Sequence, residues 1–244
     1  MKHLHCIIPA RLNASRFPHK PLALIDDKEM ILHVLEKATQ VKNFSEVWCA
    51  TPDQTILDCV KSAGFNAILT PDSFATGSDR VAWAAQQLNS EYIVNIQGDE
   101  PLISVDFLNL FSDVILSETQ NHIGWWTSAS PLNAADHHKK SCVKINVIDG
   151  YAQKFFRSGQ CTPETFKHRG VYAFSMQSLN SFSQIPQSHA EKALSLEQLR
   201  VFPKTPFRVI LDESFAPSVD TPQDLIEIKN LLKISNSNLN LLDS

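Results

Sequence analysis

The chain has 244 residues, of which 43% are hydrophobic and 20% are charged, and its formal net charge is −4. This size fits an ordinary buried core, so we expect residues 1–244 to form a single domain. A mildly acidic chain is a poor candidate for sequence-independent nucleic-acid binding, which needs a field of lysines and arginines.

Strands and helices are predicted to alternate in the N-terminal part of the chain. Short apolar runs predict strands, and apolar residues at helical spacing predict helices. In chain order these are a strand at 3–8, a helix at 30–41, a strand at 46–51, a helix at 55–63, a strand at 66–70, a helix at 78–88 and a strand at 92–96. The alternation predicts an α/β fold whose mostly parallel sheet carries helices on both faces. Ligands of such sheets bind beyond the carboxyl ends of the strands.

The middle of the chain is predicted to be antiparallel. Apolar runs predict strands at 125–132, 142–148, 152–157 and 169–175, with little helix between them. Asp149-Gly150 is a strong signal for a tight turn between two of these strands. We therefore expect a small antiparallel lobe over about 124–175, which is a candidate dimer interface.

The C-terminal part is predicted to return to helix. A helix is expected at 189–199, a strand at 207–211, and a final helix that begins at Pro222 behind a cap at Asp220 or Thr221. The tail at 235–244 is rich in Asn, Ser and Leu, and we expect it to be disordered.

The N-terminus and the cysteines bear on the cellular compartment in which the protein is expected. The first apolar stretch ends at Pro9, which is too short for a signal sequence or a membrane span. The five cysteines include no C-x-x-C pair, and three lie in or beside apolar runs, which favours small buried side chains over a catalytic thiol. We therefore expect a cytoplasmic protein that does not associate with membranes.

The glycines exclude the common nucleotide-binding fingerprints. The chain has only seven glycines, and they form neither G-x-G-x-x-G nor the P-loop pattern. The H-E-x-x-H motif and paired C-x-x-C motifs are also missing, which argues against a zinc hydrolase. A nucleotide site would have to be built from cationic side chains and a metal.

The loop after the first predicted strand carries three cations, Arg11, Arg16 and Lys20. Clustered cations at a strand end suit a polyphosphate, because each can give charge-assisted hydrogen bonds to phosphoryl oxygens. The alternative is a merely solvated loop. Three prolines argue against it, since they stiffen the loop.

Three other segments are candidates for the same site. Asp99 and Glu100 directly follow a predicted strand and suit a divalent cation, although a simple turn capped by Asp99 is the alternative. Asp220 fits a helix cap on local grounds alone. The turn at 76–80 opens a helix, where backbone N–H groups and Arg80 suit an anion.

These segments, in this order, resemble the 3-deoxy-manno-octulosonate (Kdo) cytidylyltransferases, or CMP-Kdo synthetases. The resemblance covers nearly the whole chain, and its pieces are specific only in combination. The matching segments are 9–11, 17–22, 76–80, 97–101, 143–144, 150–152, 168–172, 196–200 and 219–222. The resemblance implies a homodimer with the Rossmann-like, three-layer fold of the nucleotide-diphospho-sugar transferases.

The resemblance also implies the reaction and the residues that serve it. CTP and Kdo would give CMP-Kdo, a precursor for lipopolysaccharide biosynthesis, and pyrophosphate, with Mg²⁺ as cofactor. The nucleotide would be held by Ala10, Arg11, Ser15, Lys20, Thr76, Gly77 and Arg80. The sugar acid would be held by Arg80, Gln97, His168, Tyr172, Glu197 and Gln198. Asp99 and Asp220 would hold the metal, and together with Lys20 they are the predicted catalytic residues.

Several alternatives stay open at this point. The acceptor of a cytidylyltransferase of this fold can also be 8-amino-Kdo, a nonulosonic acid or a polyol phosphate. A non-catalytic binding protein of the same fold is another alternative, and the presence of both Asp99 and Asp220 argues against it. His168, judged without the resemblance, fits a structural histidine better than a ligand-binding one.

Overall fold

The computed structural model describes residues 3–13, 16–118, 123–214 and 217–242, and it contains one nine-stranded sheet. The parallel part has the order β5-β4-β1-β6. Its strands are β1 (Leu4–Pro9), β4 (Phe44–Thr51), β5 (Asn66–Leu69) and β6 (Tyr92–Asn95). A separate two-stranded sheet pairs β2 (Leu24–Ile25) with β3 (Lys28–Glu29).

The remaining five strands extend this sheet and close on themselves. They are β7 (Trp125–Pro131), β8 (Lys144–Ile148), β9 (Tyr151–Phe156), β10 (Thr165–Ser175) and β11 (Arg208–Leu211). The long strand β10 pairs antiparallel with β6, β7 and β8, so it joins the parallel part to the antiparallel part. The strands expected at 124–175 are thus present, and they continue the main sheet without a break.

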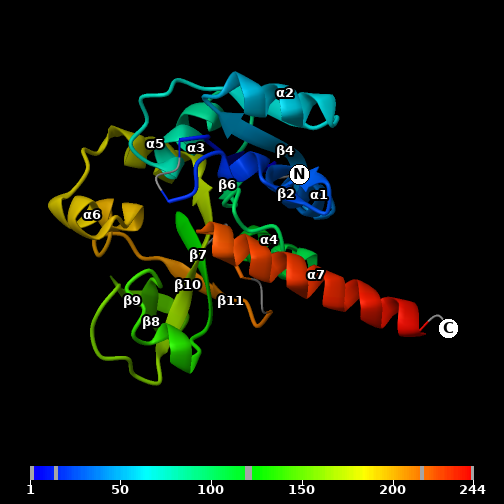
Figure 1. Cartoon of the computed structure of the whole chain (residues 1–244). Coiled ribbons are helices and arrows are strands. Elements are labelled where there is room, and N and C mark those ends of the chain that lie inside the picture. The colour runs from blue at the N-terminus through cyan, green and yellow to red at the C-terminus, as the bar shows by residue number, and fades with distance from the viewer. Residues whose placement is uncertain (1–2, 14–15, 119–122, 215–216, 243–244) are drawn as a thin grey trace.

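Helices cover both faces of the sheet, as the alternating pattern predicted (Figure 1). One apolar core lies under α1 (Met30–Thr39), α2 (Gln54–Ser62) and α4 (Val105–Glu118). The other lies under α3 (Gly77–Ala85) and α5 (Met176–Gln184). Successive residues of a strand point to opposite faces, so Cys6 and Ile8 enter the first core while Ile7 enters the second.

Helices α4 and α5 are additions to the predicted elements. In α4 the buried residues Phe107, Leu108, Phe111 and Ile115 recur at helical spacing. In α5 the side chain of Ser175 accepts a hydrogen bond from the backbone N–H of Ser178 and caps the helix. Both helices cover sheet surface that would otherwise be left exposed.

The prediction of a helix at 189–199 is wrong for the second half of that range. Helix α6 (His189–Leu194) ends at Ser195, whose backbone is left-handed with φ 52°. A 3-10 turn, η3 (Glu197–Arg200), follows it. The break turns Leu196 into the core, whereas Leu194 remains 38% exposed.

The final helix α7 (Pro222–Leu242) runs through most of the stretch 235–244 that was predicted to be disordered. No glycine or proline follows Pro222 to end the helix. Its first turns pack Leu225, Ile228 and Leu232 against a small core around Met30. No helix in the described part of the chain combines the length and apolarity needed to span a bilayer.

Ser195 offers a test of this fold. A left-handed backbone crowds the Cβ atom of any residue but glycine, so Ser195→Gly is expected to raise the free energy of unfolding by about 1 kcal/mol. Denaturant titration measures this change. Ser181→Gly, inside α5, is the control and is expected to lower stability by about 0.5–1 kcal/mol. A Ser195→Gly protein that is less stable than the parent would contradict the assignment.

Candidate active site

Two adjoining cavities open at the carboxyl ends of the parallel strands. The smaller has a volume of about 260 Å³ and the larger about 1240 Å³. Thr76, Gly77 and Gln97 line both, so the cavities meet at these residues. This is the edge of the sheet at which an α/β fold binds its ligands.

Every predicted site residue that the structure describes lines one of these cavities. The smaller cavity is lined by Ala10, Arg11, Lys20, Thr76, Gly77, Arg80, Gln97 and Asp99. The larger cavity is lined by Thr76, Gly77, Gln97, His168, Tyr172, Glu197, Gln198 and Asp220. The predicted nucleotide residue Ser15 lies outside the described residues.

Each predicted metal-binding carboxylate is paired with a cation from the loop after β1. Lys20 Nζ donates to Asp99 Oδ2 at 2.5 Å and to the carbonyl oxygen of Val219 at 2.9 Å. Arg16 donates to the two carboxylate oxygens of Asp220 at 2.9 and 3.2 Å. The backbone N–H of Val219 also donates to the carbonyl of Asp99 at 2.9 Å, which ties the two carboxylate-bearing loops together.

Asp99 and Asp220 carry carboxylate oxygens of the kind that Mg²⁺ binds, on two loops that a backbone hydrogen bond joins. This ion prefers oxygen ligands, and in nucleotide sites it takes one or two carboxylates together with substrate phosphates. Among the described residues, no group of three or more His, Cys, Asp or Glu side chains could hold a metal without such phosphates. Lys20 and Arg16 neutralise the two carboxylates in this structure. If phosphates drew these side chains away, a bound metal would supply the positive charge in their place.

Arg80 brings positive charge into the wall of the smaller cavity. It is only 3% exposed, and its Nη1 donates to the hydroxyl of Thr70 and to the carbonyl of Pro71. Its guanidinium lies 5.5 Å from the centre of the Phe74 ring. Burial and the neighbouring Arg11 both lower the pKa of Arg80. Two cations held this close together favour an anionic or electron-rich ligand.

Gln97 lies where the two cavities meet and is held against β10. Its Nε2 donates to the carbonyl of Gly170 at 3.2 Å. A Cβ atom at position 170 would stand 2.8 Å from Gln97 Cγ, so only glycine leaves room for this side chain. With the nitrogen engaged there, the amide oxygen is the atom available to a ligand.

His168 is an uncharged side chain in the wall of the larger cavity. Its Nε2 lies 2.9 Å from the hydroxyl oxygen of Thr127, which donates its own proton to the carbonyl of Val171, so Nε2 carries the proton. Burial, and then the nearby Arg169 and Arg157, lowers the pKa of His168 to about 3. The residue therefore suits hydrogen bonding and packing rather than proton transfer near neutral pH.

Gln198 presents an unpaired donor beside the larger cavity. The hydroxyl of Tyr172 donates to Gln198 Oε1 at 3.2 Å, while Gln198 Nε2 is buried and has no partner among the described residues. The neighbouring Glu197 accepts from the backbone N–H and the hydroxyl of Ser78, at 3.2 and 2.8 Å. The polar partner that Glu197 was expected to find in a sugar hydroxyl is thus supplied, in this structure, by Ser78.

Glu100 serves the protein rather than an ion. The sequence suggested it, with Asp99, as a carboxylate for a divalent cation. It is instead buried and pairs with Arg169 at 2.5 Å, and Arg169 also lies 3.7 Å from Asp212. This pair joins the loop of Asp99 to the strand of His168. In the sequence, the only signal for a role of Glu100 was its position within the segment 97–101.

Known proteins share this architecture. The family model described as Cytidylyltransferase matches residues 5–205. A 3-deoxy-manno-octulosonate cytidylyltransferase of Thermodesulfovibrio yellowstonii is 35% identical over 243 residues, covering 90% of this chain and 94% of that protein. An 8-amino-3,8-dideoxy-manno-octulosonate cytidylyltransferase of Shewanella amazonensis is 33% identical over 244 residues, covering 93% of this chain and 98% of that protein.

A solved structure extends the similarity to the fold. It is a CMP:2-keto-3-deoxy-manno-octonic acid synthetase complexed with CTP, and it matches with a TM-score of 0.90 and 33% sequence identity. The match covers 96% of this chain and 100% of that one. The expected fold and the resemblance seen in the motifs are both confirmed. The chain belongs to the cytidylyltransferase family, and within it to the 3-deoxy-manno-octulosonate cytidylyltransferases.

Proposed function

We propose that this protein transfers CMP from CTP to the anomeric 2-hydroxyl of Kdo, or of a close analogue, and releases pyrophosphate. The observation that carries the proposal is the junction of the two cavities. A cation-lined pocket meets a larger polar one beside the carboxylates of Asp99 and Asp220. The names of the relatives and the CTP bound to the similar structure support the same reaction.

Charge is the main obstacle to this reaction. CTP and the sugar acid are both anions, so their repulsion has to be cancelled before the hydroxyl can approach the α-phosphorus. Arg11, Arg16 and Lys20 supply positive charge on one loop, and Arg80 supplies it from the wall of the smaller cavity. Fixed cations and a fixed geometry then favour the in-line transition state.

We propose that the protein depends on Mg²⁺ held by Asp99 and Asp220. The ion would neutralise phosphoryl oxygens and lower the pKa of the attacking hydroxyl. Lys20 and Arg16 leave these carboxylates when the site is loaded, and they then bind the phosphates. Nucleotide and metal should therefore bind together, because either one alone would leave charges unpaired.

The larger cavity supports a polyhydroxylated acid as the acceptor. Gln198 Nε2 is a buried donor without a partner among the described residues, and a sugar hydroxyl or carboxylate would satisfy it. His168 contributes a neutral ring whose Nδ1 is an acceptor. Relatives that use Kdo and 8-amino-Kdo are about equally similar to this chain, so acceptor choice has to be measured.

We also propose a homodimer in the cytoplasm. The proposed interface is the antiparallel part over about 124–175, where Ile148, at the end of β8, is 51% exposed. All five cysteines are free thiols, which fits a reducing compartment. Light scattering during size-exclusion chromatography tests the dimer.

The acceptor is the first property to measure. Pyrophosphate release should be followed with CTP and Mg²⁺, and with Kdo, 8-amino-Kdo and a nonulosonic acid offered separately. Release with Kdo or 8-amino-Kdo is expected. A folded protein that releases pyrophosphate with none of them would contradict the proposed reaction.

Asp99→Asn tests the metal assignment. The change removes a negative ligand and the partner of Lys20, so turnover should fall by about a hundredfold or more. Isothermal titration should show that Mg²⁺ tightens CTP binding about tenfold or more in the parent and much less in the variant. Asp58→Asn, an exposed change on α2, is the control and should match the parent. Full activity in Asp99→Asn would refute the assignment.

His168 should make the folded state sensitive to acid. Its pKa is lower in the folded state than in the unfolded chain, so the unfolded chain binds the extra proton between about pH 6.5 and 3. Stability is therefore lost as the pH falls through that window. Between pH 7.5 and 5, the parent should lose about 1–2 kcal/mol more than His168→Gln. Denaturant titration at both pH values measures this, and equal losses would contradict a neutral, half-buried His168.

A further inference from the structure

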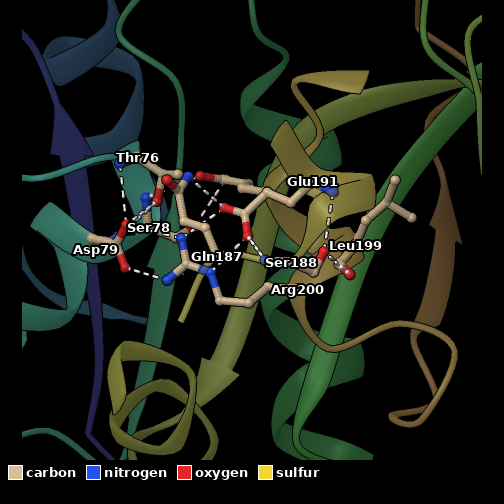
Figure 2. A network of polar contacts seen from close by, with 9 residues as sticks. Thr76, Ser78, Asp79, Gln187, Ser188, Glu191, Leu199 and Arg200 are labelled. Carbon is tan, nitrogen blue, oxygen red and sulfur yellow. Dashed lines mark hydrogen bonds and ion pairs between the residues drawn. The ribbon is translucent and has the colours of Figure 1, made fainter. Parts of the chain in front are cut away.

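Arg200 holds two carboxylates at once, as Figure 2 shows. It donates from Nη1 and Nη2 to Asp79 at 2.5 and 3.0 Å, and from Nε and Nη2 to Glu191 at 2.9 and 2.7 Å. The side chain of Arg200 is only 2% exposed, and its guanidinium lies 4.0 Å from the centre of the Phe182 ring. All three nitrogens of the planar fork are used, which a lysine could not reproduce.

The two carboxylates have the same role in two helices, since each completes the capping box at a helix N-terminus. Asp79 closes the capping box of α3 with Thr76, and Glu191 closes the capping box of α6 with Ser188. Arg200, at the end of η3, therefore fixes the beginnings of both helices relative to one turn. The hydroxyl of Ser188 also donates to the carbonyl of Leu199 at 3.0 Å, which adds a contact to the same turn (Figure 2).

The other end of this turn is held against the same helix. Glu197 accepts two hydrogen bonds from Ser78, in the first turn of α3. Gln198 lies between the contacts of Glu197 and Arg200, and it is one of the residues that line the larger cavity. The beginning of α3, meanwhile, lines the smaller cavity with Thr76 and Gly77. One rigid unit thus forms part of both walls.

We propose that Arg200 is a positioning residue that couples the nucleotide pocket to the acceptor cavity. Through Asp79 it fixes the beginning of α3, where the nucleotide binds, and through the turn it fixes Gln198, which faces the acceptor. Nucleotide binding at α3 then orders the acceptor wall. This proposal rests on the proposed function for the identity of the two ligands. A purely structural Arg200 would change stability without changing how one cavity responds to the other.

Arg200→Lys separates these two roles. It keeps the buried charge between Asp79 and Glu191 but loses the fork that reaches both. The KM for the acceptor should rise about tenfold, as expected when an outer positioning contact is lost. The KM for CTP should change little, because the capping box of Thr76 and Asp79 still holds the beginning of α3. If the Arg200→Lys protein has the same acceptor KM as the parent, then a positive charge between the two carboxylates is enough to position the acceptor wall, and the proposal is wrong.

Hydrogen exchange gives a second readout that needs no acceptor. In the parent, CTP with Mg²⁺ should slow amide exchange at 76–81 and also at 196–201. In Arg200→Lys, protection at 76–81 should remain and protection at 196–201 should be lost. If CTP protects both segments equally in parent and variant, or neither segment in the parent, the coupling is refuted.

Two further variants complete the design. Glu118→Gln breaks a partly buried ion pair between the end of α4 and Arg208 of β11. It is the control, and it should leave the exchange pattern and the acceptor KM unchanged. Asp79→Asn removes the charge that pairs with Arg200 and weakens the capping box of α3, while it leaves the contact between Arg200 and Glu191 in place. It replaces Arg200→Lys if that protein does not fold. A parent that turns over no acceptor yet shows the CTP-dependent protection would refute the proposed reaction and support the coupling.

Discussion

Ion pairing between the cationic loop after β1 and the carboxylates at the carboxyl edge of the sheet is the interaction on which this site depends. Lys20 binds Asp99, Arg16 binds Asp220, and the carbonyl of Val219 completes the arrangement. Without the cations the carboxylates would be left unpaired at one edge of the sheet. The Arg16 side chain is 60% exposed and that of Lys20 is 15% exposed. The pair of Arg16 and Asp220 therefore contributes little to stability and can exchange partners easily.

Two networks of buried ion pairs contrast with the exposed pair of Arg16 and Asp220. Arg169 joins Glu100 to Asp212, and Arg200 joins Asp79 to Glu191. Removing one member of a buried network leaves an uncompensated charge, which is far more costly than breaking an exposed pair. The candidate site therefore combines charges of differing exposure at its two cavities with buried charges that hold its walls in place.

Local pattern sufficed where a motif and its structural element coincide in the chain. The loop at 9–22 follows a strand, the turn at 97–101 follows another, and both lie at the ligand-binding edge as the alternating pattern required. Local pattern failed at 189–199. Most residues of this stretch are good helix formers, but Ser195 adopts a left-handed backbone and turns the chain into η3. Such a break has no reliable signal when the residue is not glycine.

From the amino-acid sequence alone follow the class of fold, the order of most of its elements, the family and a set of candidate site residues, all of which line the two cavities where the structure describes them. These properties follow from local periodicity and from motifs that occupy loops. Which charges meet depends on how the chain packs. Glu100 and Arg169 are far apart in the chain, as are Asp79 and Arg200, and β10 and the turn at 197–200 bring them together. Pairing of this kind depends on distance in space, which no local pattern encodes.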